Sequence, residues 1–455
     1  MARVVVVGGG VTGLTVAHRL RERDPAVEVT VLDAADRPGG MLADVEVAGL
    51  RIPAGPDSFV ARKPWAVDLC RELGLDLVAP ASSGAWLWTP AGLVRYPSDT
   101  AFGIPGDPGT VFRWPGLSGR GRRRALRDLL LRTRKDPSDE ALGALLRRRL
   151  GDEATDRAIA PLLGGLYAGD VDRLSAQATF PELVAWERAQ GSLIRGAQAA
   201  MRHARAGDAT PMFQRPARGV AALPDALAAR LGERVVTGVR VTAVRAEPGG
   251  GWRFEGDGAG GAAGDAVVLA VPAAQARALL EPVARPAAEE LARLRTVSTG
   301  VVALVYPDGT ADALPEGTGF VVPRGAAPFT AVTWLSNKWP DPSYGTRAVL
   351  RCFVGADGDE DVLDAPDGDI VAACARHLSA LLPLPEPEAS RVVRWPGSMP
   401  QFELGHLDRV ARLRAHLPPG VVVTGPAYDG VGVPDCVRAA GEAAGAALDH
   451  LRSLP

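Results

Sequence analysis

Apolar and polar positions follow a different period in each part of the chain. Near the N-terminus, a run of valines from Val4 to Val7 precedes a glycine-rich turn, a helical pattern to Leu20 and a second apolar run that ends at Leu32. Uninterrupted β-branched runs are typical of strands that are buried on both faces of a parallel sheet. The opening therefore predicts a strand–helix–strand unit of a parallel α/β sheet.

The pattern changes several times along the rest of the chain. One long stretch has helical spacing, two others have short strand patterns broken by Gly and Pro, and the remainder returns to strand–helix alternation. We therefore expect an α/β chain with a Rossmann-like dinucleotide-binding domain made of discontinuous segments, an antiparallel-sheet substrate domain and an inserted helical domain. The predicted boundaries are 1–84, 212–296 and 400–455 for the first domain, 85–110 and 297–399 for the second, and 111–211 for the third.

Some single elements are predicted with bounds. Helical spacing predicts helices at Trp65–Leu73 and Ile370–Leu382. The apolar run Phe329–Pro340 is among the predicted strands of the antiparallel sheet. Near the C-terminus, a strand at Val421–Thr424 is expected to lead into a glycine-rich loop and a final helix.

The first glycine-rich turn has the spacing G-x-G-x-x-G at Gly8, Gly10 and Gly13. The first glycine allows a tight turn, the second lets the backbone approach a pyrophosphate, and the third lets the helix pack closely on the strand. The N-terminus of the following helix offers free N–H groups and a positive dipole end to the phosphates. Asp33 lies twenty residues beyond Gly13, where an acid can accept the ribose hydroxyls. The stretch predicts a dinucleotide-binding site.

Length, charge and cysteine content narrow the class of protein. A chain of 455 residues suits two or three domains, and its net charge of −2 gives no general attraction for nucleic acid. The four cysteines are widely spaced without a C-x-x-C pair, so neither a disulfide framework nor a metal site is expected. The fingerprint begins at residue 3, which leaves no room for a signal peptide, and no apolar run is long enough to span a membrane. We expect a cytoplasmic protein.

A basic run between Arg120 and Lys135 is interspersed with leucines. One interpretation is a helix that attaches to an anionic membrane surface, and the other is a solvated helical face in an arginine-rich chain. The sequence leaves both open.

The residues after Asp33 extend the fingerprint with Arg37 and the pair Gly39-Gly40. This extension resembles the flavin amine oxidase superfamily, which implies that the dinucleotide is FAD. The superfamily usually has Glu at the position of Asp33, so the reach to the ribose is one methylene shorter here. Cys436 does not lie in the setting that monoamine oxidases use for covalent flavin, so non-covalent FAD is expected.

Three further stretches resemble the protoporphyrinogen/coproporphyrinogen oxidases, in the form typical of Gram-positive-type enzymes. They are GPDSFVARK at Gly55–Lys63, the glycine-rich run between Gly164 and Gly196, and GVGVPD at Gly430–Asp435. The resemblance implies the six-electron oxidation of coproporphyrinogen III to coproporphyrin III in haem biosynthesis, with O2 reoxidising the flavin to give H2O2. Protoporphyrinogen IX oxidation, another amine or carotenoid-type oxidation, and a flavin-bearing scaffold that no longer turns over are the alternatives.

The fingerprint and the resemblance together name candidate site residues. The flavin performs the chemistry, so no catalytic side chain and no metal ligand is expected. The expected partners are the porphyrinogen and O2, while weak peripheral membrane contact and a haem-pathway enzyme partner are left open. The predicted substrate contacts are Asp57, Lys63, Tyr167, Gly169 and Lys338. The predicted FAD contacts are Gly8, Gly10, Val11, Thr12, Gly13, Asp33, Arg37, Gly39, Gly40, Gly55, Pro56, Asp57, Ser58, Val241, Trp395, Gly425, Val431, Gly432 and Val433.

Overall fold

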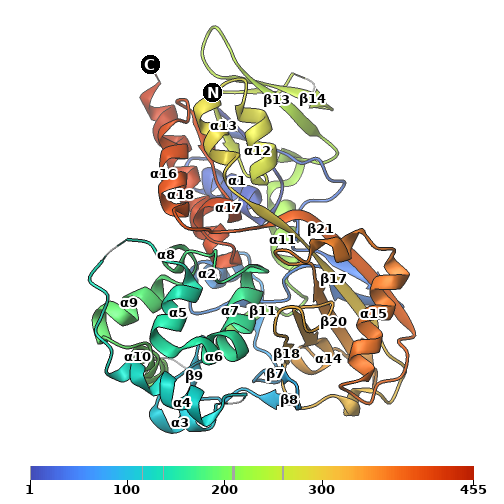
Figure 1. Ribbon diagram of the computed structural model, residues 1–455. Coiled ribbons are helices and arrows are strands. Elements are labelled where there is room, and N and C mark those ends of the chain that lie inside the picture. Colours follow the sequence, from blue (N-terminus) through green and yellow to red (C-terminus); the bar gives the residue numbers. More distant parts are fainter. Residues whose placement is uncertain (1, 115, 137, 207–210, 259–260, 455) are drawn as a thin grey trace.

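The computed structural model describes residues 2–114, 116–136, 138–206, 211–258 and 261–454. Figure 1 shows both chain termini at one end of the molecule, together with α1, α12, α13, α16 and α18. At the other end, the helices of the chain's second quarter lie on one side and a strand-rich part with α15 lies on the other. Among the described residues, no helix is both long and apolar enough to cross a membrane.

A five-stranded parallel sheet forms the centre of the first part. Its strands, in spatial order, are β12 (Val235–Val236), β2 (Glu28–Leu32), β1 (Arg3–Val7), β16 (Ala266–Leu269) and β22 (Val421–Val423). The helices around it are α1 (Val11–Arg23), α2 (Pro64–Glu72), α11 (Ala222–Leu231), α12 (Ala273–Leu280), α13 (Arg285–Leu291), α16 (His406–Ala415) and α18 (Val433–Ser453). The strands come from segments far apart in the sequence, as the strand–helix alternation predicted.

The valines of β1 explain why this strand is central. Val4 and Val6 pack into a cluster with α1, α2, α11 and α18, whereas Val5 and Val7 pack into a cluster with α12, α13 and α16. All four side chains are at most 5% exposed. Burying a valine side chain contributes about 1.5–3 kcal/mol, so the run strongly favours this two-sided position. The prediction of a strand buried on both faces is confirmed.

A seven-stranded sheet forms the strand-rich part. Its order is β21 (Ala389–Pro400), β17 (Thr296–Val305), β20 (Val349–Val354), β19 (Ala331–Trp334), β18 (Gly319–Val321), β7 (Trp86–Thr89) and β8 (Gly92–Arg95). Every pairing is antiparallel except that of β18 with β7, so the expectation of a purely antiparallel sheet is wrong at this one pair. The strand β7 comes from a distant part of the chain, so no hairpin forces it to run antiparallel to β18.

Two element predictions in this part need correction. The helix predicted at Ile370–Leu382 is α15 (Asp367–Ser379), which begins one turn earlier, after Pro366. The predicted strand Phe329–Pro340 is shorter: β19 ends at Trp334 and a helical turn, α14 (Leu335–Lys338), follows. Ser336 and Asn337 favour turns over strands, which accounts for the early end.

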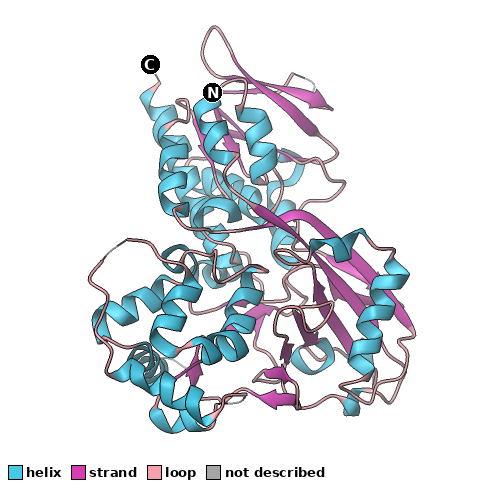
Figure 2. Ribbon diagram, viewed as in Figure 1, coloured by secondary structure: helices cyan, strands magenta, loops and turns pink. Residues whose placement is uncertain are grey.

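The second quarter of the chain is helical, as its spacing predicted (Figure 2). Its helices are α3 (Pro108–Phe112), α4 (Gly119–Leu126), the 3-10 turn η1 (Arg127–Leu129), α5 (Leu142–Leu150), α6 (Asp152–Ala154), the π-helical turn η2 (Thr155–Ile159), α7 (Ala160–Tyr167), α8 (Ala176–Thr179), α9 (Pro181–Gln190) and α10 (Leu193–Ala206). Its apolar core also takes in Phe402 from a much later segment.

The remaining elements are small. They are the hairpins β3 (Asp44–Val47) with β4 (Leu50–Pro53) and β9 (Thr100–Ala101) with β10 (Ile104–Pro105), the sheet of β5 (Phe59–Val60), β11 (Phe213–Pro216) and β6 (Leu77–Val78), the sheet of β13 (Arg240–Ala246), β14 (Trp252–Asp257) and β15 (Ala263–Gly264), and α17 (Pro426–Asp429). The predicted boundaries between the three domains stay a prediction.

Candidate functional site

The turn between β1 and α1 has the geometry of a phosphate cradle. Gly8 has φ +107°, and a Cβ there would strike the carbonyl of Ala270. A Cβ on Gly13 would strike the carbonyl of Gly8, so only glycine allows α1 to pack this closely on β1. Next to Gly10, by contrast, a Cβ would meet nothing within 4 Å. The first turn of α1, which includes Val11 and Thr12, has no side-chain cap. The cradle therefore has open space and free helix N–H groups where an anion would lie.

Asp33 lies at the end of β2, beside this cradle. One carboxylate oxygen accepts the N–H of Gly9, and the other accepts the N–H of Ala35 at 2.7 Å. Each carboxylate oxygen can accept a second hydrogen bond, so Asp33 retains acceptor capacity for a sugar hydroxyl. Its shorter side chain thus braces the glycine turn directly.

The loop after β2 returns to the cradle. Gly39 donates its N–H to the carbonyl of Gly9 at 2.8 Å, and Gly40 lies against Gly10. Arg37 is exposed and donates to the carbonyls of Pro38 and Gly40, both at 3.1 Å. The guanidinium of Arg37 therefore stabilises the turn itself in this conformation.

The segment Gly55–Ser58 is held from behind by charged side chains. Lys338 Nζ lies 2.8 Å from one oxygen of Asp57, and Arg351 Nη1 lies 3.1 Å from the other. Arg351 also donates to the carbonyl of Gly55, and Ser58 donates to Asp57 at 2.7 Å. We call Asp57, Lys338 and Arg351 the Asp57 triad. The exposed fractions of their side chains are 7%, 14% and 0%.

The triad holds Asp57 in its charged form. Burial raises the pKa of Asp57, but the charges of Lys338 and Arg351 and the hydrogen bonds from Lys338 and Ser58 outweigh it and hold that pKa far below its usual range. Burial lowers the pKa of Arg351, and Asp57 opposes that shift. In this conformation Asp57 and Lys338 bind each other, so their predicted contact with substrate would require that they exchange partners. Pro56, which lies between Gly55 and Asp57 in the chain, is exposed.

Lys63 and the C-terminal loop meet in a second ion pair. Lys63 Nζ lies 2.8 and 2.9 Å from the two carboxylate oxygens of Asp435, in the first turn of α18. The loop Gly425–Val433 leads from β22 into α18, and a Cβ on Gly425 would meet nothing within 4 Å. The structure thus brings the predicted segments around Lys63, Val431, Gly432 and Val433 together.

Tyr167 and Gly169, two of the predicted substrate contacts, lie beside the apolar core of the helical part. The Tyr167 ring packs against Phe180 and Phe402 in the helical core, and its hydroxyl donates to the carbonyl of Thr179 at 3.3 Å. A Cβ on Gly169 would strike Gln401. Both residues pack against protein in this conformation, so their contact with substrate stays a prediction.

Val241 and Trp395 come from two further sheets. Trp395 Nε1 donates to the carbonyl of Ala54 at 2.7 Å, which ties β21 to the segment before Gly55. Val241 lies on β13, outside the parallel sheet, and packs against the apolar cluster that contains α12. The predicted contacts of Val241 and Trp395 with FAD stay a prediction.

Sequence reasoning missed Arg351, Arg215 and Asp435. Arg351 interrupts the apolar run of β20, and a charged residue in such a run signals a buried ion pair. Arg215 is 9% exposed and its guanidinium lies 4.4 Å from the Trp339 ring centroid, a contact that only the fold reveals. Asp435 is the last residue of the GVGVPD motif, and its position after Pro434 in a helix start was a usable signal.

One group of potential metal ligands lies among the described residues. His18, Glu22 and Glu72 bring their ligand atoms within 4.8 Å of one another on α1 and α2. Arg19 pairs with both carboxylates, at 2.7 Å from Glu72. Because Arg19 already pairs with both carboxylates, the group is better described as an ion-pair network.

Comparison with known proteins decides the family. The pattern of the family described as flavin containing amine oxidoreductase matches residues 11–448. The chain belongs to this family. As a flavin amine oxidoreductase it has the α/β fold of that family, with mixed sheets and helices, and it is a flavin-dependent oxidoreductase.

Within this family, relatives named as porphyrinogen oxidases are similar to the chain over nearly its full length. The chain is 34% identical to the coproporphyrinogen III oxidase of Bacillus subtilis (strain 168) over 466 residues, which cover 99% of this chain and 98% of that one. It is 35% identical to the coproporphyrinogen III oxidase of Mycobacterium tuberculosis (strain ATCC 25618 / H37Rv) over 463 residues, 98% and 97% of the two chains. The crystal structure of a putative protoporphyrinogen oxidase from Exiguobacterium sp. 255-15 has a TM-score of 0.87 and 32% identity, with 99% of each chain covered. The predicted resemblance to the porphyrinogen oxidases is confirmed.

The site residues fit a flavin dinucleotide. The open space at Gly10 and the uncapped start of α1 suit a diphosphate. At the end of β22, the Thr424 hydroxyl is buried and finds no hydrogen-bond partner in the described part of the chain. A ligand that reaches from α1 to the start of α18 would supply that partner.

The buried side chain of His406 is expected to make the free energy of unfolding depend on pH. His406 begins α16, is 2% exposed, and its ring stacks on Phe402 with 4.0 Å between centroids. Burial, aided by Arg409 and Arg414, lowers the pKa of His406 from 6.5 to about 4, against the opposing effects of the Tyr428 backbone and Asp139. The unfolded chain therefore takes up this proton at a higher pH than the folded chain. Stability is fully present above pH 6.5 and falls by up to about 3 kcal/mol as the pH drops from 6.5 to about 4.

The measurement is urea unfolding at pH 7.5 and at pH 5. Replacing His406 by Phe is expected to remove most of the loss between the two values, whereas His203→Gln, at an exposed position on α10, is expected to leave it unchanged. An equal loss in the His406→Phe variant would assign the pH dependence to other groups.

Proposed function

We propose that this flavin amine oxidoreductase binds FAD non-covalently and oxidises coproporphyrinogen III to coproporphyrin III in haem biosynthesis. The observation that carries the proposal is the identity of 34–35% over nearly the full length of relatives named coproporphyrinogen III oxidase. When bound, the flavin accepts two electrons per cycle, so three cycles remove six electrons, and O2 takes them up as H2O2. The protein positions the macrocycle and excludes competing reactions.

The chain's own residues would divide the work of binding. The cradle at Gly8–Gly13 would hold the diphosphate and Asp33 the ribose, with the predicted contacts from residues 37–58, Val241, Trp395 and Gly425–Val433 along the rest of the cofactor. The parallel sheet would thus form an FAD-binding domain of discontinuous segments, and the seven-stranded sheet would form the substrate domain. Among the predicted substrate contacts, Lys63 is the most accessible, with 42% of its side chain exposed.

The test is anaerobic addition of coproporphyrinogen III to the flavin-loaded enzyme. Bleaching of the flavin absorbance, followed on aeration by coproporphyrin III and H2O2, supports the proposal. No bleaching would favour a scaffold that no longer turns over. Acid precipitation tests the mode of binding: flavin released into the supernatant supports non-covalent FAD, and flavin left on the precipitate contradicts it.

A second candidate is the oxidation of protoporphyrinogen IX, because the structurally similar Exiguobacterium protein is named a protoporphyrinogen oxidase. Coproporphyrinogen III carries four propionates and protoporphyrinogen IX two, so cationic side chains near the macrocycle should decide between them. A higher kcat/KM for coproporphyrinogen III is expected. A clear preference for protoporphyrinogen IX would reverse the order of the two candidates.

We also propose a cytoplasmic location with peripheral contact to anionic membranes through the basic run. Arg120, Arg123 and Arg127 are exposed, and Leu130 is 85% and Phe112 56% exposed close by in the chain. Arg124 does not contribute, because it donates to carbonyls at the end of α5.

Flotation with anionic and neutral vesicles tests this contact. Leu130→Ser is expected to reduce recovery with anionic vesicles. Leu454→Ser, at an exposed position near the C-terminus, is the matched control and is expected to behave as the wild type. Equal recovery of all three proteins would assign the arginines to a solvated surface.

A further inference from the structure

The pair of Lys63 and Asp435 lies where two predicted cofactor-binding segments meet. Lys63 is the residue before α2 and follows the Gly55–Ser58 segment, while Asp435 follows the Gly430–Gly432 loop. The ammonium contacts both carboxylate oxygens, at 2.8 and 2.9 Å. The charges of the two residues therefore cancel locally.

The carboxylate of Asp435 is held in place by the chain around it. Its side chain is 14% exposed. A Cβ on either Gly430 or Gly432 would lie 2.8 Å from Asp435 atoms, so the loop closes over this side chain. Gly430 also has φ +125°, which favours glycine. Asp435 thus fixes both the loop and the position of a negative charge.

The Asp435 carboxylate lies in the first turn of α18. Without a compensating cation, it would offset the positive N-terminal end of this helix. The helix α18 follows β22, the edge strand of the parallel sheet, and packs against α1, which follows β1. Both helices begin at the carboxyl ends of parallel strands, the edge where ligands bind in such sheets. A helix N-terminus favours negative charge nearby, and an uncompensated carboxylate in its first turn would cancel that effect.

We propose that Lys63 balances the charge of Asp435 so that the positive end of α18 acts on the flavin. This inference rests on the proposed placement of FAD along Gly425–Val433. The two-electron-reduced flavin carries negative charge at its pyrimidine end, so a carboxylate without Lys63 disfavours reduction. The balance acts on the flavin itself and is separate from any contact between Lys63 and a substrate carboxylate.

The test measures the flavin midpoint potential by reductive titration against a reference dye, without any porphyrinogen. Lys63→Met leaves Asp435 unbalanced, and we expect the two-electron reduction equilibrium to weaken about tenfold, which is about 30 mV. Asp435→Asn leaves Lys63 unbalanced and is expected to shift the potential in the opposite direction. The double variant Lys63→Met/Asp435→Asn restores neutrality and is expected to lie close to the wild type.

Lys63→Arg and Asp435→Glu keep the charges and guard against misfolding, and both are expected to keep the wild-type potential. Lys135→Met, at an exposed position in the helical part, is the matched charge control. An unchanged potential in both single variants would overturn the proposal and leave Lys63 to the substrate. Equal shifts in the single and double Lys63 variants would overturn it as well. Because no porphyrinogen is used, loss of the proposed turnover would not affect this result.

Discussion

Asp57→Asn is expected to lower the free energy of unfolding by about 3–5 kcal/mol, because it leaves the buried Arg351 and the partly buried Lys338 without their carboxylate. Arg351 is fully buried, so water cannot replace the charge that it loses, whereas the Lys338 side chain is 14% exposed. The neutral amide also accepts the hydrogen bonds from Lys338 and Ser58 more weakly than the carboxylate does. Since Arg351 also binds the carbonyl of Gly55, the segment Gly55–Ser58 should lose its position.

Urea unfolding of the flavin-free protein measures the loss, and titration with FAD measures the effect on the predicted cofactor contact. The matched control is Asp449→Asn, which breaks a surface pair with Arg452 whose side chains are 76% and 68% exposed. That pair is expected to contribute less than about 1 kcal/mol. Equal unfolding midpoints for the two variants would show that the Asp57 triad does not hold this segment.

The predictable part of the site is the part that is local in sequence. The cradle at Gly8–Gly13 and the acid at Asp33 lie within one strand–helix–strand unit, so their spacing alone predicted their geometry. The Asp57 triad joins residues 57, 338 and 351, and its formation depends on the register of β19 and β20. A single sequence does not contain that register.

The directions of side chains were the second feature that the sequence did not predict. Helical spacing predicted the segment that contains Tyr167, but it did not predict that the ring packs against Phe180 and Phe402 in the helical core. Phe402 lies more than two hundred residues further along the chain. The basic run is a second example, because its amphipathic pattern did not reveal that Asp128 within it is fully buried.

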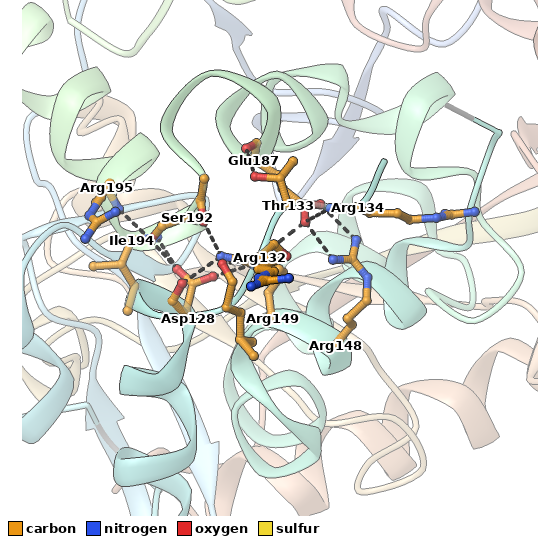
Figure 3. Close-up of polar contacts among 12 residues, drawn as sticks. Asp128, Arg132, Thr133, Arg134, Arg148, Arg149, Glu187, Ser192, Ile194 and Arg195 are labelled. Carbon is orange, nitrogen blue, oxygen red and sulfur yellow. Dashed lines mark hydrogen bonds and ion pairs between the residues drawn. The ribbon is translucent and has the colours of Figure 1, made fainter. Parts of the chain in front are cut away.

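Asp128→Asn is expected to lower the free energy of opening of the helical part by about 3–5 kcal/mol and to leave the parallel sheet intact. Arg149 is fully buried, and its Nε lies 2.5 Å from one oxygen of Asp128 (Figure 3). The other oxygen accepts the Ser192 hydroxyl and the N–H of Ile194 at 2.9 Å, at the start of α10. Arg149 further donates to the carbonyls of Asp128 and Gly191 at 2.7 and 2.6 Å. One carboxylate thus joins η1, α5 and α10.

The amide in Asp128→Asn keeps only one acceptor oxygen and no charge, so the ion pairing of Arg149 is reduced to its 3.5 Å contact with the Glu187 carboxylate, and the hydrogen bonds to Ser192 and Ile194 at the start of α10 weaken. Hydrogen exchange is expected to show faster exchange in α5 and α10 and unchanged protection in β1 and β16. Arg127→Gln, at the exposed neighbouring position, is the matched control and should leave both unchanged.

A double variant separates two effects, the loss of the ion pair and the burial of a charge without its partner. Replacing a buried ion pair by apolar residues of similar volume is often neutral, whereas removing one partner is strongly destabilising. Asp128→Leu/Arg149→Met should therefore recover much of the protection that Asp128→Asn loses, although the N–H of Ile194 still lacks its carboxylate acceptor. If the double variant exchanges as fast as Asp128→Asn, the cap on Ser192 and Ile194 carries the stability and the ion pair adds little. The run between Gly191 and Gly196, which is part of the glycine-rich stretch that resembles the porphyrinogen oxidases, would then act first as the anchor of α10.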